Sequence, residues 1–343
     1  MELRQSLGVE LPVIQAPMAG AQLGAMTIAV CQAGGLGSLP CAMLDATAIR
    51  REIGAIRAVI GSRSFNLNFF CHRPPVPDAA REAAWRKALA PYYDEFGLDI
   101  SAVPALPSRY PFDATSAELI EELRPQVVSF HYGLPDVPLL ERVHATGARV
   151  LASATTLDEA LWLERRGVAA VIAQGLEAGG HRGHFLVDDL SLQSGTFALV
   201  PQLVRALRTP VIAAGGIADR AGVEAALRLG AAMVKVGTAY MCCPEATTSA
   251  IHRQALLSEA ARHTALTRLI TGRPARGIVN RLMREVDDAV APEFPLATAA
   301  LAPLRAAAEA RGSGDFSPLW SGQNASGCRA VGAAEMTRAL AGA

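Results

Sequence analysis

The sequence has almost no lysine and no run of charge of a single sign. Lys87 and Lys235 are its only lysines, and 32 basic residues balance 32 acidic ones, so the formal net charge is zero. Because there is no basic tail or stripe, we expect neither nucleic acid nor an anionic membrane as a partner. The preference for arginine reflects codon bias, which makes Lys235, inside an apolar run, a residue to follow.

Cysteine and long hydrophobic runs are also scarce. The six cysteines form no CxxC pair and match no zinc-binding spacing, so we predict no metal site. Free thiols are typical of a reducing cytosol, and we expect a cytoplasmic protein. No apolar run reaches the roughly 18 residues of a membrane span, and the start MELRQSLGVELP does not have the character of a signal peptide.

What the chain does contain is a short apolar run followed by a helix-like stretch, repeated eight times. Each run is rich in Val, Ile, Ala or Phe and ends at Gly, Pro or a polar residue, as strands buried on both faces do. Strand alternating with helix indicates a parallel sheet, and eight such units predict an α/β fold closed into a (β/α)8 TIM barrel. The runs cover residues 12–19, 35–40, 64–70, 127–133, 149–156, 169–175, 209–216 and 233–241.

Two stretches interrupt this rhythm. One is Pro-rich and aromatic and follows the third run; the other is mostly helical by pattern and follows the eighth. Both therefore belong at the C-terminal mouth of the barrel, where we expect a smaller, mainly helical substrate lobe. The predicted organisation is a barrel over 1–73 and 114–243, an insertion over its mouth at 74–113, a helical substrate lobe at 244–311 and a return to the barrel at 312–343.

Glycines follow the seventh and eighth runs, where barrel enzymes commonly bind phosphate. Gly215 and Gly216 in AAGGIADR precede a helix whose first N–H groups and dipole favour an anion. Gly237 and Thr238 add small residues and a hydroxyl group. Together these loops predict a phosphate site, which a phosphorylated substrate or a flavin mononucleotide would satisfy equally.

The loop after the sixth run, IAQGLEAGGHRGHF, is the most specific feature of the chain. Its glycines let the main chain approach something flat, and Gln174 is placed to hydrogen-bond a ring edge. His181, in a glycine-rich turn at the end of a barrel strand, is predicted to be functional. For Arg182 we expect an ion pair at the surface or in the loop, and His184 has no assigned role.

Side chains at the ends of three other runs also face the predicted mouth. Met18 is placed to pack on a flavin face, and Asn68, buried among apolar neighbours, needs a polar partner such as a cofactor amide. His131 and Tyr132 are candidate residues of a substrate pocket. The chain contains no P-loop and no GxGxxG motif after the first run. It also has no Ser, His and Asp residues in the order and loop context of a catalytic triad.

The motifs QAPMA, EAGGHRG, AAGGIAD and KVGTAYMCCPEA resemble those of the nitronate monooxygenases of class I, formerly called 2-nitropropane dioxygenases. HTALTRLITGRPARGIVNRL and RGSGDFSPLWSGQ are similar to the C-terminal region of that family, so the resemblance covers nearly the whole chain. It implies non-covalently bound FMN and oxidation of alkyl nitronates by O2 to a carbonyl compound and nitrite. It also implies a detoxifying role, with propionate 3-nitronate as physiological substrate.

The resemblance carries over residue by residue. It implies that His181 is the active-site histidine and that Gly322 and Gln323 touch the cofactor. One departure is Lys235, where the family often has Gln; we expect its side chain to meet the phosphate or a carboxylate. The implied FMN contacts are Met18, Asn68, Gln174, Gly179, Gly216, Lys235, Val236, Gly237 and Thr238.

Several alternatives stay open from the sequence. An FMN-dependent enoyl-thioester reductase or an NADH:quinone reductase would use a similar barrel and loop. A non-catalytic protein that binds a phosphorylated ligand lacks a recognisable effector domain here. A sugar-phosphate isomerase would need paired acid and base groups, and Glu177 is the only carboxylate at a strand end. The preferred nitronate is not readable, and a homo-oligomer is left open.

Overall fold

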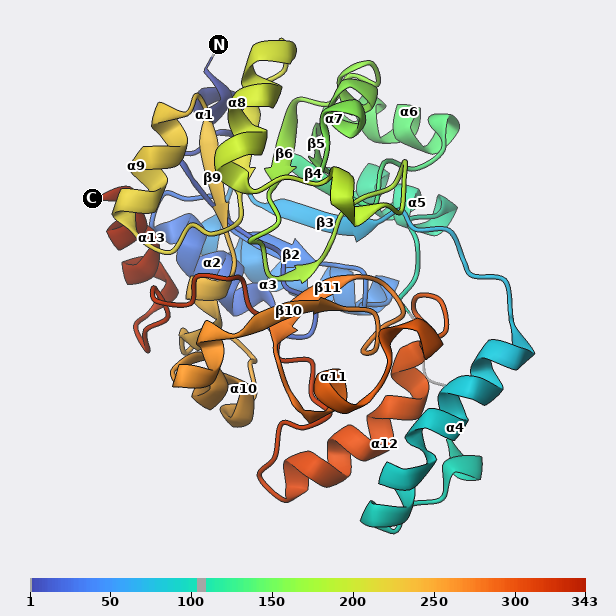
Figure 1. The fold of residues 1–343 in the computed structure, drawn as a ribbon. Helices are drawn as coiled ribbons and strands as arrows, with labels where there is room; N and C mark the ends of the chain where they lie inside the picture. Colours follow the sequence, from blue (N-terminus) through green and yellow to red (C-terminus); the bar gives the residue numbers. More distant parts are fainter. Residues whose placement is uncertain (1, 104–108) are drawn as a thin grey trace.

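Eight parallel strands close into a barrel in the computed structural model, which describes residues 2–103 and 109–343 (Figure 1). The sheet order is β1-β9-β8-β6-β5-β4-β3-β2. Closure comes from main-chain hydrogen bonds between β1 and Leu36, at 2.9 and 3.0 Å. The predicted barrel is therefore confirmed. Its strands are β1 (Val13–Gln15), β2 (Ser38–Pro40), β3 (Asn66–Phe70), β4 (Val127–His131), β5 (Arg149–Ala154), β6 (Ala170–Gln174), β8 (Val211–Ala214) and β9 (Met233–Val236).

Side chains fill the lower part of the barrel, so it is a packed core and not a pore. Ile14, Ile172 and Met233 belong to one buried apolar cluster inside the strands, and Leu3 and Leu7 of α1 (Leu3–Leu7) close it from below. The alternate residues pack outward against the helices. Toward the C-terminal ends of the strands, polar side chains replace this core and open a cavity.

A ring of helices covers the outside of the barrel (Figure 1). Their starts follow the capping rules: the side chains of Asp45, Thr156 and Asp219 each accept a hydrogen bond from an N–H of the first turn. These helices are α2 (Gly24–Gln32), α3 (Ala46–Ile60), α5 (Ala114–Leu123), α6 (Val137–Ala145), α7 (Leu157–Glu164), α8 (Thr196–Ala206), α9 (Arg220–Arg228) and α13 (Ala333–Ala341).

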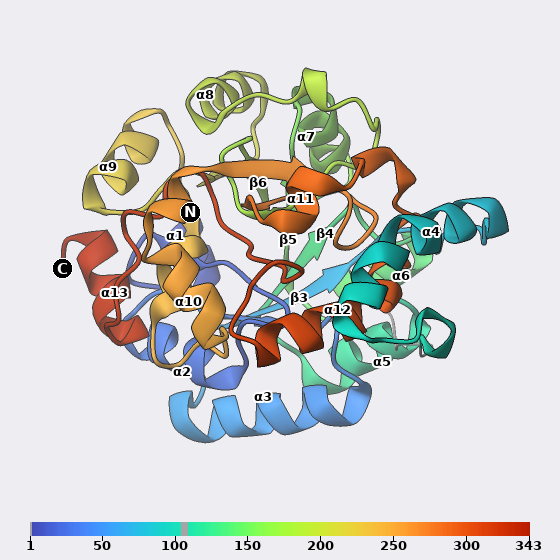
Figure 2. The same ribbon diagram turned by 60° about the horizontal axis from the view of Figure 1, so that its bottom comes forward.

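A second, smaller apolar core lies in a lobe built from two distant parts of the chain. Trp85 and Tyr93 of α4 are buried against α12, and they donate hydrogen bonds to the carbonyls of Ala297 and Ala300. Figure 2 shows α10, α11 and α12 in front of the barrel strands, with α4 beside them. The elements of this region are α4 (Ala79–Phe96), η1 (Ile100–Ala102), η3 (Thr238–Cys242), α10 (Ala250–Leu256), η4 (Glu259–Arg262), α11 (Arg281–Glu285), η5 (Asp288–Val290) and α12 (Ala297–Ala310).

A three-stranded antiparallel sheet joins the lobe to the barrel. The sequence pattern over 244–311 predicted helices and did not indicate this sheet. Its order is β10-β11-β7, with β10 (Thr264–Thr267), β11 (Ala275–Ile278) and β7 (Gly180–His181). The segments TALT and ARGI are too short and too poor in large apolar residues to indicate strands. Because β7 is part of the loop after β6, this sheet fixes the His181 loop to the lobe.

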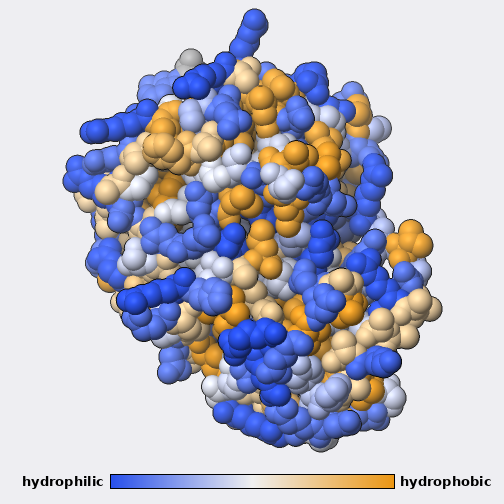
Figure 3. All heavy atoms as spheres, in the orientation of Figure 1, coloured by the Kyte–Doolittle hydropathy of each residue, from blue (hydrophilic) through white to orange (hydrophobic). Residues whose placement is uncertain are grey.

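The surface shown in Figure 3 intersperses hydrophilic and hydrophobic residues over both barrel and lobe. Among the described residues, no helix combines the length and the apolar character needed to cross a bilayer.

Candidate active site

A cavity opens where the C-terminal ends of the barrel strands meet the lobe. The structure brings together in its wall nearly all the residues predicted for the cofactor and the substrate, from six strands and the loops that follow them. Tyr132 is the exception, because it lies one layer behind the wall. The predicted residues that line the cavity are Met18, Asn68, His131, Gln174, Gly179, His181, Gly216, Lys235, Val236, Gly237 and Thr238.

One end of this cavity presents main-chain N–H groups from the loops after β8 and β9. Gly216 has φ of 71°, a left-handed conformation that favours glycine. Within the described residues, we find no main-chain acceptor for the N–H groups of Gly216, Gly237 and Thr238. Unpaired donors of this kind form a cradle for an anion such as a phosphate group.

The C-terminal return segment packs against this cradle. Gly322 donates its N–H to the Thr238 hydroxyl at 3.0 Å, and the Asn324 side chain donates to the carbonyl of Gly216 at 3.1 Å. Gly322 and Asn324 line the cavity, whereas Gln323 does not. The sequence alone missed Asn324, because nothing in GQNAS places the segment against β8 and β9.

Gln174, at the end of β6, shapes the His181 loop. Its Oε1 accepts a hydrogen bond from the N–H of Gly183 at 2.7 Å, and its Nε2 donates to the carbonyl of His181 at 2.9 Å. The side chain that the sequence assigned to a ring edge is therefore engaged at both ends by the protein. Gly179 is needed in the same loop, since a Cβ there would lie 2.5 Å from the nitrogen of Gly322.

Arg182 does not make the surface or loop ion pair that we expected. It is fully buried, and its guanidinium donates to the carbonyls of Gln174 and Gly175 at 2.7 Å and to Gln193 Oε1 at 2.8 Å. Burial lowers its pKa to about 10. The fork of donors thus fixes the strand-to-loop turn from beneath, a role that its position beside His181 in sequence concealed.

Asn68 and Lys235 present polar groups to the cavity from inside the barrel. The amide nitrogen of Asn68 donates to the carbonyl and hydroxyl of Ser129 at 3.1 and 2.9 Å, which leaves its oxygen without a donor among the described residues. Lys235 has neither a carboxylate partner nor a hydrogen bond there. The expected carboxylate is therefore absent from the described structure, and desolvation lowers the pKa of Lys235 to about 7.

His131 supports the His181 loop from below. Its Nδ1 lies 3.1 Å from the Ser153 hydroxyl and its Nε2 lies 3.3 Å from the carbonyl of His181. Burial, and then the nearby charge of Lys235, lower its pKa to about 3, so the ring is neutral. A Cβ on Gly183 would lie 2.6 Å from this ring, which explains the glycine at that position.

His181 lies at the opposite end of the cavity from the N–H cradle. Its Nε2 is 2.9 Å from the hydroxyl of Thr271, a lobe residue, and its ring packs against Phe294 and Trp320 at centroid distances of 5.4 and 5.6 Å. Burial, followed by the charge of Arg109, holds the pKa of His181 well below its usual 6.5. The imidazole is therefore neutral near pH 7.

Tyr132 and His184 are buried beside the site. Tyr132 has φ of 70°, a strained conformation for a bulky residue, and its ring lies under the guanidinium of Arg273 at 4.2 Å. His184, whose role the sequence left open, is 3.2 Å from Asp188 and does not line the cavity. Burial lowers the pKa of His184 to about 4.

Sequence reasoning missed the residues that the lobe and the insertion bring to the cavity. Arg109 and Trp320 line it, and Phe294 backs it, and all three lie in segments without a strand or helix pattern. The sequence feature that could have pointed to these three residues is the presence of aromatic and basic side chains in otherwise Pro-rich stretches. Among the residues that the structure describes, no cluster of His, Cys, Asp or Glu is suited to a metal.

A closed α/β barrel with unpaired N–H groups after its seventh and eighth strands and a partly buried histidine after its sixth is typical of TIM-barrel enzymes whose sites hold a phosphate group. Comparison with known proteins makes this specific. The model of the nitronate monooxygenase family matches residues 2–341. This chain belongs to the nitronate monooxygenase family.

Individual relatives agree with that assignment. The nitronate monooxygenase of Paraburkholderia phytofirmans is 43% identical over 97% of this chain and 92% of its own length. That of Pseudomonas aeruginosa is also 43% identical, over 97% of this chain and 96% of its own. A solved structure of nitroalkane oxidase from Streptomyces ansochromogenes is 33% identical, with a TM-score of 0.88, covering 99% of this chain and 97% of that one.

Proposed function

We propose that this enzyme uses FMN and O2 to oxidise alkyl nitronates to a carbonyl compound and nitrite, and so removes toxic nitronates such as propionate 3-nitronate in the cytoplasm. The observation that carries the proposal is a single cavity with unpaired main-chain N–H groups at one end and a neutral, partly buried His181 at the other. Membership of the nitronate monooxygenase family supports it.

The residues present fit FMN. The N–H groups of Gly216, Gly237 and Thr238 would hold its phosphate, while the oxygen of Asn68 and the ammonium of Lys235 would meet polar atoms of the ring or ribityl chain. Bound FMN would supply the redox chemistry by accepting electrons from the substrate and passing them to O2.

Met18 adds an apolar surface to this cofactor site. Its thioether lies near Gly237, since a Cβ on that glycine would be 3.7 Å from the Met18 sulfur. A flexible sulfur-containing side chain packs well on an aromatic ring. The barrel over 1–73 and 114–243 would hold the cofactor, and the segments 74–113 and 244–311 would enclose the substrate.

His181 acts on the substrate side in this proposal. A nitronate is already deprotonated, so the enzyme needs no strong base to use it. Neutral His181 would donate one hydrogen bond to the nitronate group and would contribute no positive charge to it. With a neutral nitroalkane, His181 would instead accept the α-proton.

Anaerobic mixing tests the proposal against its alternatives. The purified yellow protein should be bleached rapidly by propionate 3-nitronate and only slowly by NADPH or NADH. An enoyl-thioester reductase or a quinone reductase would show the reverse order. A protein that releases no flavin on denaturation would contradict the cofactor assignment itself.

A further inference from the structure

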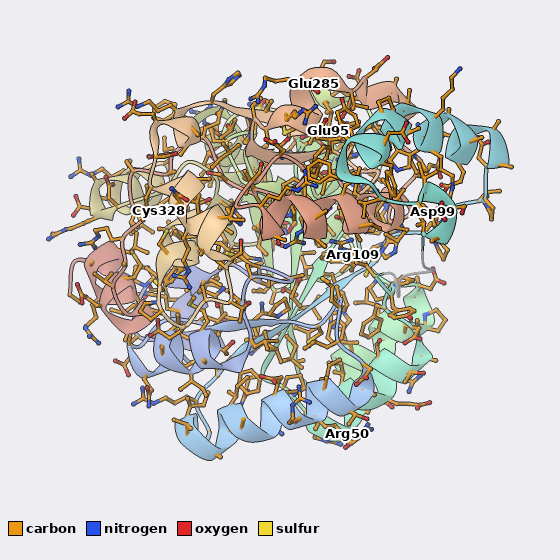
Figure 4. The ribbon with its side chains drawn as sticks, turned by 90° about the horizontal axis from the view of Figure 1, so that it is seen from below. Arg50, Glu95, Asp99, Arg109, Glu285 and Cys328 are labelled. Carbon is orange, nitrogen blue, oxygen red and sulfur yellow. The ribbon has the colours of Figure 1, made fainter. Side chains whose placement is uncertain are left out.

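Arg109 is a largely buried guanidinium that faces the cavity without an acidic partner. It lines the wall near His181, and no carboxylate of the described residues forms an ion pair with it. Burial lowers its pKa, and the only group that opposes this shift is Tyr132. Figure 4, which looks onto the lobe side, labels Arg109 near the middle of that face. A buried charge of this kind is costly unless an anion meets it.

The groups around Arg109 are also donors without acceptors. The hydroxyl of Tyr132 and the Nε of Arg273 are buried and have no hydrogen-bond partner in the described structure. The acids nearest to this cluster, Asp188 and Glu159, act on Arg273 and not on Arg109. The cluster is therefore rich in donors and positive charge and lacks its own acceptor.

Phe294 fixes the relative positions of these groups. The guanidinium carbon of Arg109 lies 5.7 Å from the Phe294 ring centroid, and the rings of His181 and Tyr132 lie 5.4 and 5.7 Å from the same centroid. Arg109 and the imidazole therefore both flank the Phe294 ring, so an anion bound by Arg109 would lie in the part of the cavity that holds His181. The N–H cradle at Gly216 is at the other end of the cavity and does not compete for it.

We propose that Arg109 is a specificity-determining residue that binds a carboxylate on the far end of the substrate while His181 meets the nitronate group. The inference rests on the proposed function. Guanidinium and carboxylate match as a two-point fork, which fixes orientation as well as charge. The enzyme then selects nitronates that carry a second negative charge over simple alkyl nitronates.

The test compares two substrates in one variant. For Arg109→Met, kcat/KM with propionate 3-nitronate should fall by about a hundredfold, the cost of removing one partner of a buried charged pair. With butyl 1-nitronate, which has an ethyl group in place of the carboxylate, kcat/KM should change less than about threefold. Equal losses on both substrates would mean that Arg109 binds the nitronate group itself and would overturn the proposal.

Two further variants guard against a folding artefact. Arg311→Met removes another guanidinium that stacks on an aromatic ring, at 4.3 Å from the Phe96 centroid, but lies outside the cavity. This variant should leave the ratio of kcat/KM for propionate 3-nitronate to kcat/KM for butyl 1-nitronate unchanged. Arg109→Lys keeps the charge and loses the fork, so it should restore part of the preference that Arg109→Met abolishes; no recovery with the lysine would count against carboxylate binding.

A binding measurement separates this inference from the proposed function. Succinate, which cannot be oxidised as a nitronate, should bind the FMN-loaded wild type in calorimetry and should fail to bind Arg109→Met. If the protein does not turn over any nitronate but still binds succinate through Arg109, the proposed function fails and the carboxylate site stands. If nitronates are oxidised but succinate binds both proteins equally, the carboxylate site is refuted.

Discussion

The two ends of the cavity are built in different ways. At the barrel end, main-chain N–H groups of Gly216, Gly237 and Thr238 would bind the cofactor in our proposal, and they lie in the loops that follow β8 and β9. At the lobe end, side chains would bind the substrate, and they come from the loop after β6, from the insertion and from the segment after β9. Backbone donors recognise what all substrates of the fold share, whereas side chains on inserted segments select the individual substrate.

His181 lies at the lobe end, and removing it should have the largest effect. Asparagine can replace its hydrogen bond but cannot accept a proton, so His181→Asn should lower kcat/KM for nitroethane by about a hundredfold or more. Turnover of ethyl nitronate should fall much less. Oxygen uptake with both substrates measures the difference, and equal losses would exclude a role as base.

Trp85→Ala should destabilise the lobe and leave the barrel folded. The side chain is fully buried between α4 and α12, and such a truncation costs about 3–5 kcal/mol. We expect the variant to lose turnover while it still binds FMN. Thermal denaturation measures the loss of stability, and flavin absorbance measures the bound FMN. Trp162→Ala is the control, because Trp162 is a partly buried residue on the barrel helix α7. Loss of FMN in step with turnover would show that the two cores form one unit.

Gly179→Ala should weaken the barrel end alone. The added Cβ would meet the main chain of Ser321 and Gly322, and an overpacked contact of this kind costs about 1–3 kcal/mol. The dissociation constant of FMN, measured by fluorescence quenching, should rise accordingly. Gly54→Ala, on α3, meets nothing within 4 Å and should leave it unchanged. Unaltered FMN affinity in Gly179→Ala would argue against this loop as a cofactor contact.

Lys235→Gln should have the smallest effect, and that effect should depend on pH. Because the pKa of Lys235 in the cofactor-free protein is about 7, its ammonium is present below that pH and lost as the pH rises through it. The ratio of FMN dissociation constants, variant to wild type, should therefore be largest near pH 6 and approach one near pH 9. A ratio that stays constant with pH would show that the charge of Lys235 does not contribute to FMN binding.

The same contrast explains how much of the structure the sequence predicts. The eight barrel strands are readable because strands buried on both faces become continuous apolar runs, and the phosphate loops follow from their order. Arg182 was misread because its sequence neighbours are polar loop residues, although its guanidinium turns inward to main-chain carbonyls. The position of a residue along a strand predicts which way its side chain points, whereas its position in a glycine-rich loop does not.

The lobe end was hidden for a different reason. Arg109 and Phe294 are far apart in sequence and belong to no periodic element, so only tertiary packing brings them to His181. The strands β10 and β11 were missed because each is four residues long, and because β11, which pairs with β10, also pairs across a long sequence separation with β7. The substrate selection that we propose for Arg109 therefore depends on contacts that no local pattern encodes.

Oxygen uptake by the purified enzyme with propionate 3-nitronate, with nitrite measured in the same sample, tests the account most directly. A yellow protein that consumes O2 and releases nitrite, without any added NADPH, is the predicted result. A yellow protein that consumes no O2 with propionate 3-nitronate or with butyl 1-nitronate would contradict the proposed function.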